Sequence, residues 1–98
     1  MNEPDVIRAL GALAQSSRLQ VFRALVVAGQ GGLNPSTLSD TLGVPSTALS
    51  FHLKELLGAG LVTQERNGRH LIYRADFAAM QLLMGYLTEN CCGGAGCC

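Results

Sequence analysis

Residues 1–90 contain no cysteine, and all four cysteines of the chain lie within residues 91–98. Cysteine is among the most frequently buried residue types, so a small domain would normally place some of it in its core. Its absence from the first segment separates packing from thiol chemistry. We therefore expect a folded domain over residues 1–90 and a flexible tail, rich in cysteine and glycine, over residues 91–98.

The sequence also lacks long apolar runs and an excess of charge of either sign. No stretch approaches the ~20 apolar residues that a membrane span needs, and no basic segment leads into an apolar run at the amino terminus. These absences predict a cytoplasmic protein with no membrane partner. The formal net charge is zero, which argues against a general polyanion binder.

The composition is apolar for so short a chain, since 48% of the residues are hydrophobic and only 14% are charged. A domain of this size buries roughly 60 to 70% of the surface of its unfolded chain. More apolar side chains are present than one small domain can cover. We therefore expect a dimer.

Apolar residues recur at helical spacing in the first part of the chain. Pro4 marks the start of a first helix. The expected apolar face of this helix consists of Val6, Ile7, Leu10, Leu13 and Ala14. Ser16 or Ser17 offers a cap for a second helix, which glycine ends at residue 29.

A helix-turn-helix pattern follows. Residues 37–42 predict a short helix that Gly43 ends, and residues 46–57 predict a longer helix with Ser46 as its cap. The order of short helix, glycine-containing turn and longer helix is that of a helix-turn-helix.

The hydrophobic period then changes from about 3.6 to 2. Residues 61–66 and 69–74 read as two strands flanking Asn67-Gly68, which is the strongest short-range hairpin signal. A last helix is expected from Asp76, its N-cap, to Asn90. The fold class is therefore mainly α with a β-hairpin wing, a winged helix-turn-helix of order ααααββα.

The longer helix of this motif has an outward face suited to a DNA major groove. Its leucines cluster on one side, and hydroxyl groups, an aromatic ring and one cation remain on the other. Hydroxyls can bond base edges, an aromatic ring can touch a thymine methyl, and lysine can reach a phosphate. The candidate DNA-binding residues of this helix are Ser46, Thr47, Ser50, Phe51 and Lys54. The alternative is an ordinary solvated helix face.

The hairpin adds Arg66, Arg69 and His70 near Asn67-Gly68, where they would lie beside the backbone phosphates. The alternative is that these cations only keep a hairpin tip soluble. His52 lies at the edge of the buried helix face and is expected to be a hydrogen-bonded packing residue rather than a ligand.

Leu13-Ala14-Gln15-Ser16-Ser17-Arg18-Leu19 and the run STALSFHLKELLGAGLVTQERNGRHLIYR over residues 46–74 resemble the ArsR/SmtB family of metal-responsive winged-helix repressors. The resemblance covers about residues 5–90. It implies a homodimer joined through its first and last helices, which binds double-stranded operator DNA and leaves it when an inducer binds. It also implies that Ser46, Thr47, Ser50 and Phe51 face bases while the wing arginines contact phosphate.

The family places its inducer sites at different positions, and this sequence lacks the residues for two of them. Residues 33–40 contain no thiol, and residues 76–89 contain no histidine. The remaining ending, Tyr86-Leu87-Thr88-Glu89-Asn90-Cys91-Cys92, resembles an arsenic-responsive variant in which another cysteine follows shortly after.

Thiolate chemistry independently favours soft ions over magnesium, calcium or manganese. Trivalent arsenic takes three thiolates, which Cys91, Cys92 and either Cys97 or Cys98 can supply through the glycine spacer. Zinc bound by four cysteines is the main competitor, and arsenic is favoured over it because structural zinc sites usually use C-x₂₋₄-C spacing, whereas adjacent ligands strain a tetrahedron. A disulfide framework is not expected, because cytoplasmic thiols stay reduced and bridges here would close very small loops.

The sequence therefore predicts a repressor released by As(III), supplied as arsenite or methylarsenite, or by the related ion antimonite, with no organic cofactor. A thiol-based redox sensor and a sensor of cadmium, zinc or copper(I) are the alternatives within the same fold. A metal-buffering protein that does not bind DNA is the alternative from another class. An enzyme is not expected, since the sequence presents no nucleophile-base arrangement or carboxylate pair.

Overall fold

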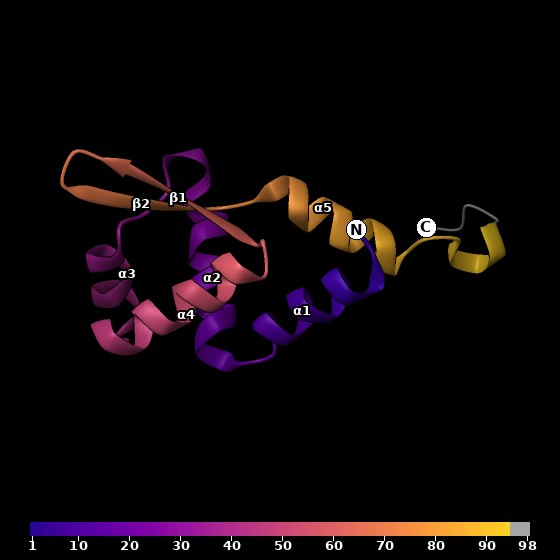
Figure 1. Ribbon diagram of the computed structural model, residues 1–98, viewed down its shortest axis with the longest axis horizontal. Coiled ribbons are helices and arrows are strands. Elements are labelled where there is room, and N and C mark those ends of the chain that lie inside the picture. Colours follow the sequence, from indigo (N-terminus) through magenta and orange to yellow (C-terminus); the bar gives the residue numbers. More distant parts are fainter. Residues whose placement is uncertain (95–98) are drawn as a thin grey trace.

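The computed structural model describes residues 1–94, which form five α-helices and one antiparallel β-hairpin (Figure 1). The helices are α1 (Glu3–Leu13), α2 (Ser16–Ala28), α3 (Pro35–Leu42), α4 (Ser46–Gly58) and α5 (Phe77–Leu87). The strands are β1 (Val62–Asn67) and β2 (His70–Ala75), and short 3-10 turns cover η1 (Gly29–Gly31) and η2 (Cys91–Gly94). The predicted order ααααββα and the winged helix-turn-helix architecture are confirmed.

Side chains cap four of the helices of this segment. In each case a side-chain oxygen accepts a hydrogen bond from the backbone N–H three residues ahead, at 2.8 to 3.0 Å. The capping residues are Asn2, Gln15, Asn34 and Asp76. Such bonds satisfy N–H groups that have no partner within the helix. The predicted cap at Asp76 is confirmed.

Two predicted caps are wrong. Gln15 caps α2, while Ser16 and Ser17 are its first helical residues, because the longer glutamine side chain reaches the amide of Arg18 from one position earlier. Ser46 is the first residue of α4, and Pro45 holds the cap position without a side-chain hydrogen bond. Proline at φ −57° already has the backbone angle of a helix start.

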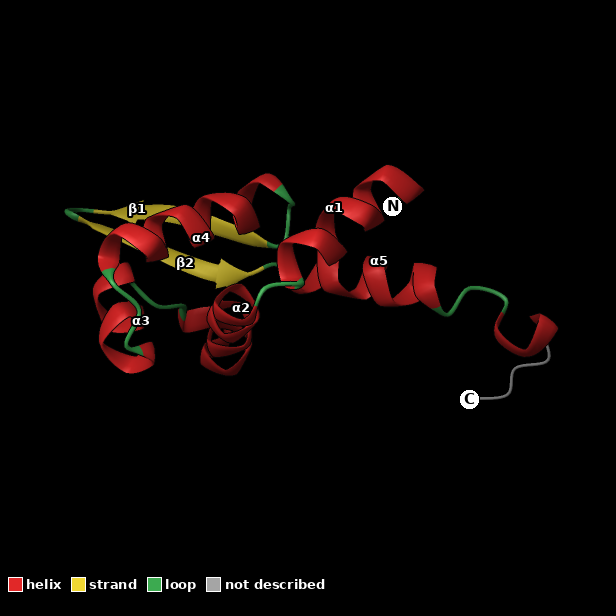
Figure 2. Cartoon of the chain, turned by 90° about the horizontal axis from the view of Figure 1, so that it is seen from below, coloured by secondary structure: helices red, strands yellow, loops and turns green. Residues whose placement is uncertain are grey.

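The core lies where α2 and α4 pack against the hairpin, with α4 beside β1 and α2 beside β2 (Figure 2). Leucine fills most of it. The largest fully buried side chains are Val21, Leu25, Leu38, Leu49, Leu53, Leu56 and Leu61. The helix-turn-helix is therefore held by the same leucines that carry its helical periodicity.

The apolar face predicted for the first helix is buried only in part. The residues of α1 that pack inside are Val6, Ala9 and Ala12, while Ile7 is 61% exposed and Leu10 is 38% exposed. Small alanines face the core because α1 lies close to α2 and α4. Of the predicted face, Val6 is buried and Leu13 packs partly against the core, whereas Ile7 and Leu10 remain on the outside of the molecule.

The hairpin and the last helix each differ from expectation at one end. Asn67 pairs with His70, so the two-residue turn is Gly68–Arg69 instead of Asn67-Gly68, and Gly68 takes the required positive φ of 66°. α5 ends at Leu87, before Asn90. The Thr88 hydroxyl donates to a carbonyl of the last helical turn at 2.8 Å, which competes with continued helix.

The molecule is elongated, with a longest dimension of 49 Å. The hairpin lies at one end, while α1 and α5 lie side by side toward the other, and the segment after α5 leads away from the body there (Figure 1). None of the described helices is long and apolar enough to cross a bilayer.

Gly32 and Gly29 offer a matched test of how tightly the hairpin packs. Both have φ near +68° (67° and 69°) with extended ψ, a region that is essentially restricted to glycine. An added Cβ at Gly29 meets nothing within 4 Å, whereas at Gly32 it would lie 2.6 Å from the Tyr73 carbonyl oxygen.

We expect Gly29→Ala to lower the free energy of unfolding by about 1 to 3 kcal/mol, the cost of backbone strain alone. Gly32→Ala should cost distinctly more, because backbone must also move. Urea unfolding followed by circular dichroism measures both. Equal losses would show that the hairpin does not pack closely against residue 32.

Candidate nucleic-acid interface and thiol segment

All five residues predicted on the outward face of α4 are exposed, in agreement with the helical wheel. These residues are Ser46, Thr47, Ser50, Phe51 and Lys54. Leu49, Leu53 and Leu56 are buried on the opposite side. Phe51 is 54% exposed, an unusual position for a phenylalanine in a small domain. The face combines hydroxyls, one aromatic ring and one ammonium group.

Phe51 is supported from below by Arg18 of α2. The Arg18 guanidinium carbon lies 5.9 Å from the centre of the Phe51 ring, within the usual range of a cation–π contact. Arg18 also faces Glu55, with Nη1 and Oε2 4.0 Å apart. Sequence reasoning missed Arg18 because its contacts are made across two helices, and no local pattern marks them.

The wing places its predicted cations in water. Arg66 and Arg69 are exposed, and Arg69 lies in the turn itself. His70 begins β2 and is also exposed. The one-residue shift of the turn thus moves an arginine to the tip of the hairpin, where it extends farthest from the body.

Charge pairing leaves this end of the molecule cationic. The two nearby carboxylates each have an arginine: Glu55 faces Arg18 at 4.0 Å, and Glu65 accepts a hydrogen bond from Arg74 at 2.8 Å. Within residues 1–94, Lys54, Arg66 and Arg69 have no carboxylate within ion-pair distance. A local positive surface therefore exists despite a net charge of zero.

His52 is buried, at 9% exposure, which confirms its packing role. The expected hydrogen bond is not found at one of its nitrogens, since Nδ1 is buried and has no hydrogen-bond partner among the described residues. The ring lies edge-on to Phe51, with centroids 6.1 Å apart. His52 thus forms part of the support beneath the outward face of α4.

The thiol segment begins where α5 ends. The Cys91 N–H donates to the Thr88 carbonyl at 3.0 Å, and Cys91 is half-buried. Asn90 and Cys92 both have left-handed backbone, with φ of 58° and 54°, so the chain bends sharply around Cys91. Such angles are uncommon for residues other than glycine.

Cys92, the second predicted ligand of this segment, is exposed. The other two predicted ligands, Cys97 and Cys98, lie outside the described residues. Within the described part of the chain, no group of three side chains could hold a metal ion. The described segment thus contains two of the predicted sulfur atoms.

Comparison with known proteins gives the same assignment as the geometry. A family described as a helix-turn-helix domain matches residues 13–65. A protein of Halobacterium salinarum, named as an arsenical resistance operon repressor, ArsR, is 35% identical over 82 residues, covering 84% of this chain and 62% of its own length. An ArsR-like transcriptional regulator from Rhodococcus sp. RHA1 superposes with a TM-score of 0.79 at 27% identity, covering 88% of this chain and 78% of that one.

The chain belongs to the ArsR/SmtB family. A further structural relative of this family member is the homodimeric winged helix-turn-helix DNA-binding domain of Mb0332 from Mycobacterium bovis, with a TM-score of 0.68 at 29% identity, covering 88% of this chain and 84% of that one. The chain spans about three fifths of the length of the Halobacterium ArsR protein (62%). The family prediction made from the sequence is confirmed.

Proposed function

We propose that this ArsR/SmtB-family chain is a DNA-binding transcriptional repressor that leaves its operator when trivalent arsenic binds the thiolates of residues 91–98. The observation that carries the DNA-binding part is the uncompensated positive charge of Lys54, Arg66 and Arg69 beside the exposed face of α4. A surface of this kind attracts the phosphate backbone while a helix face reads bases.

In this proposal α4 enters the major groove. Thr47 and Ser50 lie on its outward side and offer hydroxyls to base edges, and Phe51 offers an apolar ring to a thymine methyl. The support of Phe51 by Arg18 restricts the ring before DNA arrives, which lowers the entropy lost on binding. The wing lies beside this helix and contacts the neighbouring phosphates.

Phe51 and Lys54 should separate specific from non-specific binding. We expect Phe51→Ala to weaken specific operator binding by about 1 to 3 kcal/mol and to leave binding to a scrambled duplex almost unchanged. Lys54→Gln should weaken both, and should lower the slope of log K against log salt by about 0.9. Fluorescence anisotropy with labelled duplexes measures these effects.

The matched control is Val27→Ala on the outer face of α2, where the side chain is 82% exposed. This variant should bind both duplexes as the wild type does. Equal weakening of specific and scrambled binding by Phe51→Ala would contradict base reading by α4.

The proposal includes a homodimer formed through α1 and α5. These two helices lie side by side and expose large apolar residues in one region of the molecule (Figure 1). Those that are at least 38% exposed are Ile7, Leu10, Leu82, Met84 and Leu87. Covering such a surface with a second copy would remove it from water. Two recognition helices about 34 to 36 Å apart would then reach successive major grooves.

Leu82→Glu should therefore yield a monomer, because the glutamate would have to be buried without a partner at the interface. The control is Val27→Glu, which adds the same charge at an apolar position that is 82% exposed on α2. Sedimentation equilibrium distinguishes the two masses. A Leu82→Glu protein that stays dimeric would show that the interface lies elsewhere.

The identity of the inducer is argued from the atoms that would bind it. Cys91 and Cys92 are adjacent, and two sulfur atoms with no histidine or carboxylate among the predicted ligands favour a soft, thiophilic ion. Arsenic(III) takes three thiolates, so one of Cys97 and Cys98 completes the set. Cadmium, zinc and copper(I) are the competing ions. The relative from Halobacterium, which is named for arsenical resistance, supports arsenic over these.

When its cysteines are kept reduced, the wild-type protein should leave operator DNA on addition of arsenite. Cys91→Ser and Cys92→Ser should each abolish this release without changing the affinity for DNA. Of Cys97→Ser and Cys98→Ser, one should abolish release and the other should serve as its control. Anisotropy titrations with arsenite, antimonite, zinc, cadmium and copper(I) measure the response. Release of the Cys92→Ser protein by arsenite would refute the site.

A thiol-based redox sensor is the second candidate, because Cys92 is exposed and a second cysteine, Cys91, precedes it directly. In that case peroxide oxidises two thiols to a disulfide and is itself reduced to two molecules of water. The two candidates differ in what reverses release. Reductant alone would restore DNA binding after peroxide, whereas an arsenite response requires reduced thiols throughout.

A further inference from the structure

The base of the wing is joined to the segment that connects α2 to α3. The Leu33 N–H donates to the Tyr73 carbonyl at 3.0 Å, and the Tyr73 N–H donates to the Leu33 carbonyl at 2.8 Å. These two bonds add Leu33 to the edge of β2 as an isolated bridge. The hairpin therefore has a fixed base, while its tip extends into solvent.

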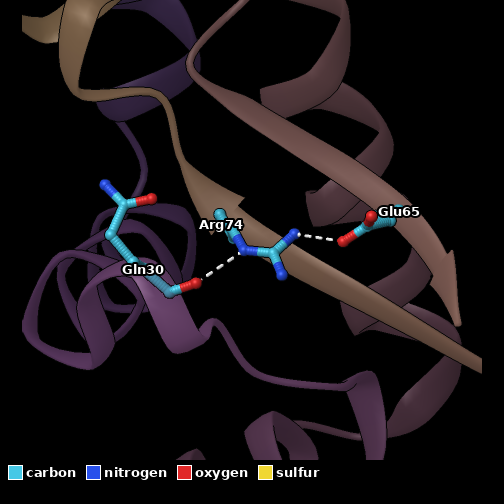
Figure 3. A network of polar contacts seen from close by, with 3 residues as sticks. All are labelled: Gln30, Glu65 and Arg74. Atoms are coloured by element: carbon cyan, nitrogen blue, oxygen red, sulfur yellow. Dashed lines mark hydrogen bonds and ion pairs between the residues drawn. The ribbon is translucent and has the colours of Figure 1, made fainter.

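The Arg74 side chain forms hydrogen bonds to both Gln30 and Glu65 at this base (Figure 3). Its Nε donates to the Gln30 carbonyl at 2.7 Å, and its Nη1 donates to the Glu65 carboxylate at 2.8 Å. One rigid guanidinium, from β2, thus links η1, the turn that follows α2, to β1. A lysine has a single ammonium group and lacks this planar fork.

The position of the tip depends strongly on this anchor. Arg69 lies about five residues from Arg74 along the hairpin, or about 17 Å at ~3.4 Å per residue. A tilt of about 10° at the base would displace the tip by about 3 Å, the length of a hydrogen bond. Beyond Val62 the residues of β1 are exposed, so the core holds the base of the hairpin and not its tip.

We propose that Arg74 is a positioning residue for DNA binding: it contacts no phosphate itself but fixes the wing so that Arg66 and Arg69 reach the backbone. This inference depends on the proposed DNA-binding function. It assigns Arg74 a role that its charge alone would not give, because Glu65 already accepts a hydrogen bond from its guanidinium.

The test is a double-mutant cycle on operator binding, with the salt slope as the readout. In the wild-type background, Arg66→Gln with Arg69→Gln removes two phosphate contacts at a slope of about 0.9 each. Between 50 and 200 mM salt, the affinity of the wild type should then fall about 12-fold more than that of the double variant. The single substitution Arg74→Gln should lower the salt slope by the same amount as the double variant does.

In the Arg74→Gln background, removing Arg66 and Arg69 should change the slope little further. Arg23→Gln is the charge-matched control, since Arg23 is an exposed arginine on α2, and it should leave the slope unchanged. Arg74→Gln combined with Glu65→Gln should keep the low slope, because restoring the local charge does not restore the anchor. Circular dichroism tests whether each variant is folded. If Arg74→Gln does not fold, Arg74→Lys replaces it in the same cycle.

Each other outcome overturns the proposal. A slope that drops by only about 0.9 in Arg74→Gln and adds to the loss from Arg66 and Arg69 would make Arg74 a direct phosphate contact. Recovery of the slope by Glu65→Gln would reduce its role to neutralising charge. If the wing arginines have no effect in the wild type while Phe51→Ala still weakens binding, the wing does not bind DNA and needs no positioning. If none of these variants changes operator binding, the proposed DNA-binding function fails as well.

Discussion

The apolar surface that α1 and α5 leave in water is the constraint on which the rest of the molecule depends. α1 packs its alanines inward and leaves Ile7 and Leu10 outside, and α5 leaves Leu82, Met84 and Leu87 exposed. Burial of apolar surface is the dominant favourable term in association as in folding. In the proposed homodimer a second copy covers this surface, and the helices that form it set the positions of the two wings relative to each other.

This arrangement connects the thiol segment to the wing through α5. The thiol segment follows α5 directly, and α5 follows β2 directly, with the Asp76 N–H donating to the Leu61 carbonyl at 2.8 Å. A change at the end of α5 would be transmitted through the surface between subunits and the base of the wing, and not through a ligand-to-DNA contact. Coupling of about 1 to 3 kcal/mol is typical of such systems, and a modest rotation between subunits would suffice to misplace two recognition helices.

The sequence predicts most of this fold because its strongest signals are local. The leucine periodicity of α4, Gly43 after α3 and Asp76 before α5 are each decided within a few residues, and the structure agrees with them. The turn lies one residue later than predicted, since Asn67 pairs with His70 and Gly68, which adopts a positive φ without strain, takes the first turn position. The apolar face predicted for α1 includes the exposed Ile7 and Leu10, because hydrophobicity marks what must leave water without stating whether the same chain or a second copy covers it.

In the candidate site, too, residues with a local sequence signal were predicted and residues placed by long-range contacts were not. The outward residues of α4 follow from a helical wheel, whereas Arg18 beneath Phe51 and the Arg74 anchor at Gln30 require contacts between residues 33 and 44 positions apart. Such contacts are set by how helices and strands pack, and polar residues give no periodic signal of it. What a sequence can indicate is where chemistry is kept away from packing. Here the cysteines follow a helix that ends at Leu87 and a backbone that turns left-handed at Asn90. Cys91 and Cys92 thereby lie outside the core, where a ligand or oxidant can reach them without unfolding the domain.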